Sequence, residues 1–198
     1  MSIDIFEIIM TKQDGRNLRS INSQKLIVDA CIKLFKAGNL EPTAQQVADE
    51  SGVGIRTVFR QFDEMENLFK SVDAVLSKDY DFEVRYDPSS SFDARLQSTI
   101  SHMNAGYEKH KLIMFMTVSK MWKYEFLRKN YLMYQDLIKS KTEEILPEVL
   151  SFDTESRHLF HASLSFAMWT RLQGQKLNNG QINKAMFRQC ILITNDNK

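Results

Sequence analysis

The chain has 198 residues, of which 43% are hydrophobic and 26% are charged, and its formal net charge is +1. These values fit an ordinary globular protein of one or two domains, and 7 glycines and 3 prolines are too few for a turn-rich β sandwich or barrel. No apolar run approaches the length of a membrane span, and residues 1–10 are apolar but carry Asp4 and Glu7 with no basic region before them, so we expect a cytoplasmic protein without a signal peptide.

The first predicted helix covers residues 23–37, where pairs of apolar residues recur every four positions. Asn22 or Ser23 can cap its start, and Gly38 suits the left-handed conformation that ends many helices. This segment therefore supplies one apolar helix face to an N-terminal domain.

Three more helices are predicted in the first third of the chain. A capping box, with Thr43 at the N-cap and Gln46 three positions later, begins a short helix that ends near Gly52. A second short helix fits residues 54–61, and a longer one begins at a second capping sequence, residues 63–66.

Residues 43–62 meet the requirements of a helix-turn-helix. Ala48 is small enough for the second helix to cross the first, and Gly52 tolerates the positive φ that the turn needs. Apolar residues can form the buried side of the hairpin, namely Val47, Val53, Val58 and Phe62. Polar residues lie on the outer side of the second helix: Arg56, Thr57, Arg60 and Gln61. The alternative is a structural hairpin that touches no DNA.

The outer residues suit the major groove of DNA. Arg56 can form two hydrogen bonds to guanine, and Thr57 can bond a base or pack on a thymine methyl group. Thr43 is predicted to contact the phosphate backbone, because it lies at a helix N-terminus and such an end favours an anion. Gln61 is also predicted to contact the phosphate backbone.

Charge gives this prediction little support. Residues 12–62 contain eight basic and five acidic side chains, a balance of +3, so the case depends on geometry. Arg16 and Arg19 can form an arm in the minor groove, or they can belong to a solvated tail.

The same stretch, with the helix before it and the start of the helix after it, resembles the DNA-binding domain of the TetR family. The shared motifs are Leu34-Phe35, Thr43, Val47-Ala48, Gly52-Val53-Gly54, Phe59-Arg60-Gln61-Phe62 and Met65-Glu66-Asn67-Leu68. The resemblance covers about a quarter of the chain and implies a homodimer that binds a palindromic operator in double-stranded DNA. The DNA contacts predicted from it and from the helix face are Thr43, Gly54, Ile55, Arg56, Thr57, Phe59, Arg60 and Gln61.

Three positions differ from the family pattern. Gly54 replaces a Ser that caps the second helix, Phe59 replaces a Tyr, and Met65 replaces a Lys. The last two changes remove groups that contact phosphate in the family, so we expect weaker and less salt-sensitive DNA binding than is typical.

The rest of the chain follows a loop at residues 86–91 that contains proline and serine. Helical periodicity is present over residues 96–107, 111–122, 126–146, 154–176 and 181–194. The predicted fold is therefore all-α, with a three-helix helix-turn-helix domain over residues 1–76. A linker helix joins it to a helical ligand-binding and dimerisation domain over residues 77–198.

Methionine and aromatic residues are frequent in this second domain. Collectively they can line a cavity for a small apolar or aromatic molecule, as the resemblance also implies, and the candidates are Met103, Tyr107, Met114, Phe115, Trp122, Phe126, Met133, Tyr134 and Trp169. For any one of them, a place in a packed core is the alternative.

The last two predicted helices are apolar on more than one side. A helix of this kind needs two partners, so we expect a four-helix arrangement between two subunits, with contacts from Phe160, Leu164, Met168, Met186, Phe187 and Cys190. The alternative is that both faces are buried within one subunit.

No sequence motif indicates an enzyme, a cofactor or a metal. His158 and His161 have a spacing that can bind a metal, but nothing completes the site, and Cys31 and Cys190 are expected to be reduced and buried. We therefore expect a transcription regulator, specifically a repressor that a small-molecule ligand releases from DNA. The alternative is a helical ligand-binding or protein-interaction module without specific DNA binding.

Overall fold

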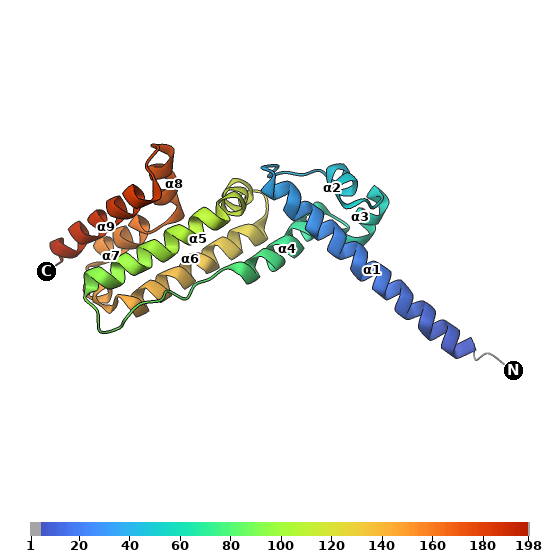
Figure 1. The fold of residues 1–198 in the computed structure, drawn as a ribbon, viewed down its shortest axis with the longest axis horizontal. Helices are drawn as coiled ribbons and strands as arrows, with labels where there is room; N and C mark the ends of the chain where they lie inside the picture. Colours follow the sequence, from blue (N-terminus) through green and yellow to red (C-terminus); the bar gives the residue numbers. More distant parts are fainter. Residues whose placement is uncertain (1–4, 198) are drawn as a thin grey trace. The chain divides into compact units, whose positions relative to one another are not determined.

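The computed structural model describes residues 5–197, with side chains from residue 17 onward. Within that range the chain has nine α-helices, two short 3-10 helices and no strand, which confirms the all-α prediction (Figure 1). Residue contacts divide the chain into two compact units, an N-terminal unit that ends at Asp79 and a C-terminal unit that begins at Tyr80.

The N-terminal unit consists of α1 (Ile5–Lys36), α2 (Ala44–Ser51), α3 (Ile55–Phe62), α4 (Met65–Leu76) and η1 (Ser77–Asp79). Its four α-helices share one core of buried apolar residues: Ile27, Val28, Ala30, Cys31, Phe35, Val47, Ala48, Val58, Phe62, Leu68, Phe69 and Val72. The rings of Phe35 and Phe69 pack across this core with their centroids 5.8 Å apart. Amphipathic packing of this kind is what stabilises helices as short as α2 and α3.

Two of the predicted caps are wrong. The first helix begins at Ile5, so Asn22 and Ser23 lie inside it, where the Ser23 hydroxyl donates to a backbone carbonyl four residues earlier. The sequence at residues 63–66 does not cap α4, whose N-cap, Glu64, makes no side-chain hydrogen bond. The Asn67 amide donates instead to the Phe62 carbonyl at 2.9 Å and satisfies the end of α3.

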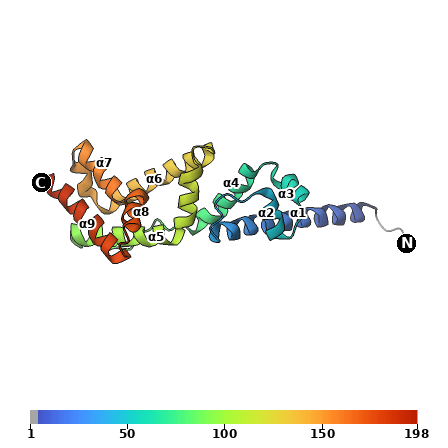
Figure 2. The same cartoon turned by 90° about the horizontal axis from the view of Figure 1, so that it is seen from above.

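The C-terminal unit consists of α5 (Phe92–Lys120), α6 (Glu125–Ile145), η2 (Pro147–Ser151), α7 (Thr154–Ser163), α8 (Phe166–Gly174) and α9 (Asn179–Asp196). In the two views α9 lies beside α5 and α7, and it also contacts α8 (Figure 2). Its core is centred on large buried side chains from these helices, including Leu96, Phe160, Trp169 and Met186.

Helix boundaries in this unit differ from the prediction in two places. The two helices predicted over residues 96–122 form the single helix α5, because nothing between them ends the hydrogen-bond ladder. The helix predicted over residues 154–176 is divided into α7 and α8 at Leu164 and Ser165. Ser165 accepts a hydrogen bond from the Met168 amide and so begins a new helix.

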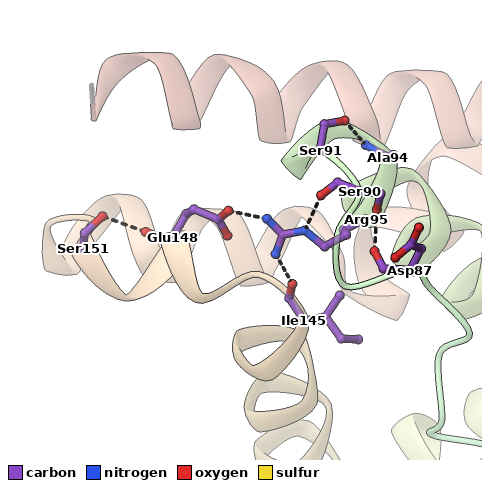
Figure 3. Close-up of polar contacts among 8 residues, drawn as sticks. All are labelled: Asp87, Ser90, Ser91, Ala94, Arg95, Ile145, Glu148 and Ser151. Carbon is purple, nitrogen blue, oxygen red and sulfur yellow. Dashed lines mark hydrogen bonds and ion pairs between the residues drawn. The ribbon is translucent and has the colours of Figure 1, made fainter.

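Arg95 ties the start of α5 to the end of α6 (Figure 3). Its guanidinium group donates to the carbonyls of Ser90 and Ile145 and pairs with Glu148 on η2. The Ile145 carbonyl is at a helix C-terminus, where it has no intrahelical partner. Arg95 therefore takes the place of a C-cap on α6 and joins the start of α5, the end of α6 and η2.

No helix in the described part of the chain combines the length and apolarity needed to cross a membrane.

Candidate nucleic-acid interface

The N-terminus of α2 is built as predicted. The Gln46 amide donates to the Thr43 hydroxyl at 3.2 Å, and the Thr43 amide donates to the Gln46 side chain at 2.9 Å, so the capping box is confirmed. Thr43 is exposed. The capping box satisfies only some of the amides in the first turn, so the rest of this helix end can favour an anion.

A tight turn joins α2 to α3. Gly52 has φ +71° and ψ +11°, the left-handed conformation that a residue without a side chain adopts most readily. Ala48 is buried where the helices pack, as predicted. Gly54 is the N-cap of α3 and gives it no side-chain hydrogen bond, so α3 begins without a side-chain cap.

The faces of α3 are clearly separated. Val58 and Phe62 are buried in the core, while Arg56 and Arg60 are exposed one turn apart. Ile55 and Thr57 are half-buried, and so is Val53, which was predicted to be buried. Phe59 is 47% exposed, so a large apolar ring stands beside the two arginines.

The charges of the two arginines are not neutralised by neighbours. Neither Arg56 nor Arg60 has an ion-pair partner among the described side chains, whereas Lys33 pairs with Glu50 elsewhere in this unit. An unpaired guanidinium group keeps its hydrogen-bond donors available for a base edge or a phosphate.

Gln61 lies at the edge of the face that carries the arginines, and Arg60 and Gln61 line the same hollow. Gln61 is half-buried, and its side-chain oxygen accepts a hydrogen bond from the Ser20 hydroxyl on α1 at 3.1 Å. It lies at an open hollow of about 690 Å³ between α1, α3 and α4. The structure thus brings together Arg56, Thr57, Phe59 and Arg60, and places Gln61 at their edge. Arg19 is exposed on α1, and the side chain of Arg16 lies outside the described residues.

The predicted ligand-binding residues of the C-terminal unit have different surroundings, some in its core and some exposed. Tyr107 and Trp169 are buried in its core, with Met103 and Met114 packed at the edge of that core. Phe115 contacts the same region through Phe166, with ring centroids 5.3 Å apart. The Tyr107 hydroxyl donates to the Leu164 carbonyl at 2.7 Å, and burial raises the pKa of that hydroxyl far above its usual range.

The other predicted ligand contacts lie apart from this core. Trp122 is 81% exposed and Met133 is 53% exposed, so neither lines an enclosed site within one chain, and this part of the prediction is wrong. Tyr134 stacks on Phe82 with centroids 5.8 Å apart, and Phe126 packs against Tyr124. Sequence periodicity places apolar residues on helix faces but does not say which faces converge.

The predicted dimer contacts are largely core residues, which contradicts that prediction. Four of them are buried within a single chain: Phe160, Leu164, Met186 and Cys190. Met168 and Phe187 are half-buried at the edge of the same core. The exposed apolar residues of these helices are instead Leu159 on α7 and Leu192 on α9, at 58% and 55% exposure.

A polar cluster between α6 and α7 was missed by the sequence analysis. Glu143 accepts hydrogen bonds from Arg157 and from His161, each at 2.8 Å. Arg157 lowers the pKa of Glu143, while burial lowers the pKa of His161. His161 is thus held in this cluster by Glu143, and no group of three or more potential metal ligands occurs among the described residues.

Both cysteines are buried, and burial raises the pKa of each thiol to about 12. Comparison with protein-family models gives no match for this chain, and a search of curated proteins also finds none.

Proposed function

We propose that the chain is a DNA-binding transcription regulator in which α2 and α3 form the helix-turn-helix and α3 enters the major groove. The observation that carries the proposal is the exposed pair Arg56 and Arg60 on a short helix whose opposite face, Val58 and Phe62, is fixed in the core. A rigid helix with free guanidinium groups on its outer face has the shape and chemistry of a major-groove reader. The resemblance of residues 23–69 to the TetR family supports the same assignment.

The other contacts have positioning roles. Thr43, at the exposed start of α2, binds a phosphate, and Thr57 and Phe59 flank the base-contacting arginines. Gln61 reaches a phosphate from the edge of the face while it accepts the hydrogen bond from Ser20.

The regulator acts as a homodimer, because a single DNA-binding unit contacts too few base pairs to be specific. Leu159 and Leu192 are the exposed apolar residues that a second subunit covers. A small apolar or aromatic ligand binds the C-terminal unit and favours a state that does not bind the operator, so that the protein is a repressor released by its ligand.

The test is selection of binding sites from random double-stranded DNA, followed by gel-shift titration of the selected site. Arg56→Ala should weaken specific binding by about 1–3 kcal/mol while affinity for random DNA changes little. Arg188→Ala is a matched control, since Arg188 is an exposed arginine on α9. Failure to enrich any sequence would refute the proposal and favour a ligand-binding or protein-interaction module.

A further inference from the structure

The first residues of the C-terminal unit have a regular pattern of their own. Residues 80–86, called the strap here, follow the last residue of the N-terminal unit and contain no helix. Exposure alternates along them: Tyr80, Phe82 and Val84 are half-buried, while the residues between them are exposed. Alternation of this kind places every second side chain on the same surface.

The inward side chains of the strap bind aromatic residues of α5 and α6. Tyr80 packs edge-on against His110 and Tyr134, with centroids 5.0 and 5.4 Å apart. Phe82 stacks on the same Tyr134 at 5.8 Å. Tyr134 therefore holds two rings of the strap at once, and Val84 reaches the core of the C-terminal unit.

Polar contacts fix the direction of the strap. The His102 ring lies 2.9 Å from the Asp81 carbonyl, and Lys141 pairs with Glu83 at 3.2 Å. Further along, Arg95 bonds the Ser90 carbonyl. The strap's partners on α5 thus run from residue 110 to 102 while those on α6 run from 134 to 141, so the strap follows about 12 Å of α5 in the antiparallel direction.

These contacts are ones that can open without unfolding the bundle. All three inward side chains are half-buried, and the Lys141–Glu83 pair is at the surface, where ion pairs are weak. The helices beneath are held by a core of buried residues, which Val84 of the strap only borders, and by Arg95. Segments with few buried contacts are the ones that open locally in native proteins.

We propose that the strap is a releasable tether. Docked, it fixes the point at which the chain leaves the C-terminal unit. Released, residues 80–86 become a flexible linker with a typical end-to-end distance of about 15 Å and a maximum reach of about 25 Å. Docking of the strap then decides whether the DNA-binding unit is firmly or loosely attached, which is a point of regulation that rests on the proposed function.

Tryptic cleavage after Arg85, an exposed residue of the strap, tests the tether directly. Tyr134→Ala removes the residue that holds two strap rings and leaves the cleavage sequence unchanged, so cleavage should become about tenfold faster. Met133→Ala is the matched control, because the neighbouring Met133 is 53% exposed, and its cleavage rate should stay within about twofold of the wild-type rate. Equal rates for the two variants overturn the proposal.

The wild-type chain gives a test that requires no substitution. At low urea, cleavage through local release should be almost independent of urea concentration, because little surface is exposed. A cleavage rate that rises with urea concentration as steeply as global unfolding does shows that the strap opens only when the whole bundle unfolds. This result overturns the proposed tether.

A second arm measures DNA binding. Phe82→Ser should weaken binding to DNA with two half-sites by about tenfold. The DNA-binding unit is then attached more loosely, which lowers the effective concentration of the second DNA-binding unit at its half-site. Affinity for a single half-site should be unchanged, and an unchanged affinity for both DNAs counts against the regulatory role. If the wild-type chain binds no DNA, the proposed function is refuted. The cleavage experiment still shows whether the strap is released locally.

Discussion

Phe160 and Leu159 are neighbours on α7 with opposite surroundings, and substituting each by alanine separates a core role from an interface role. Phe160 is fully buried and packs edge-on against Phe152 with centroids 5.8 Å apart, whereas Leu159 is 58% exposed. Removing a buried phenylalanine ring costs about 3–5 kcal/mol, through lost transfer free energy and the cavity that remains. Removing a leucine that is mostly in solvent costs less than about 1 kcal/mol in a single chain.

The assay is urea unfolding followed by tryptophan emission, with sedimentation velocity on the same samples. Trp169 is fully buried in the same core as Phe160, so its emission reports the unfolding of that core, while Trp122 is already exposed. With a slope of about 2 kcal/mol/M, Phe160→Ala should lower the midpoint by about 2 M. Leu159→Ala should leave the midpoint of the monomer nearly unchanged but increase the fraction of monomer, if α7 lies at a subunit interface.

The reverse pattern would refute this reasoning. A Phe160→Ala variant of normal stability that sediments as a monomer means that Phe160 is an interface residue, as the sequence alone predicted. A wild-type chain that sediments as a monomer at micromolar concentration removes the homodimer from the proposed function.

Further predictions concern single groups. Arg95→Met should destabilise the C-terminal unit by about 3 kcal/mol, measured by thermal unfolding, because it leaves two carbonyls and Glu148 without their cation. Gly54→Ser should stabilise the N-terminal unit by a few tenths of a kcal/mol, since it supplies the missing cap and the site has room for a Cβ. Burial lowers the pKa of His161 below 6.5, so folding stability should fall as the pH drops below about 6.5, where the unfolded chain binds the proton more readily, and His161→Gln should reduce this dependence. Both thiols, with a pKa of about 12, should react with a thiol reagent only after unfolding, which absorbance at neutral pH would show.

The N-terminal unit could be predicted from sequence in most details, because its determinants are local. The capping box at Thr43, the positive φ of Gly52 and the buried pair Val58 and Phe62 each depend on neighbours a few residues away. The start of α1 was missed because Ser23, a good cap in isolation, is also tolerated inside a helix when its hydroxyl bonds the preceding turn.

The C-terminal unit was harder to predict, because its contacts are long-range. Helix periodicity cannot distinguish an apolar face that packs on its own chain from one that packs on another, which is why Phe160 and Met186 were assigned to an interface. The division at Ser165 and the capping box of Asn178 and Gln181 were local signals that could have been recognised. The pairing of Glu143 with His161 depends on the packing of two helices, and no sequence pattern gave it.

The alternating exposure of the strap determines which length changes the chain can accept there. Deleting or inserting two residues between Tyr80 and Val84 keeps the apolar side chains of the strap on one side. Deleting or inserting one residue turns the apolar side chains that follow it toward solvent. Relatives of this chain should therefore vary in this segment by even numbers of residues. A family alignment that shows odd-length insertions at this point would mark those members in which the two units are joined in another way.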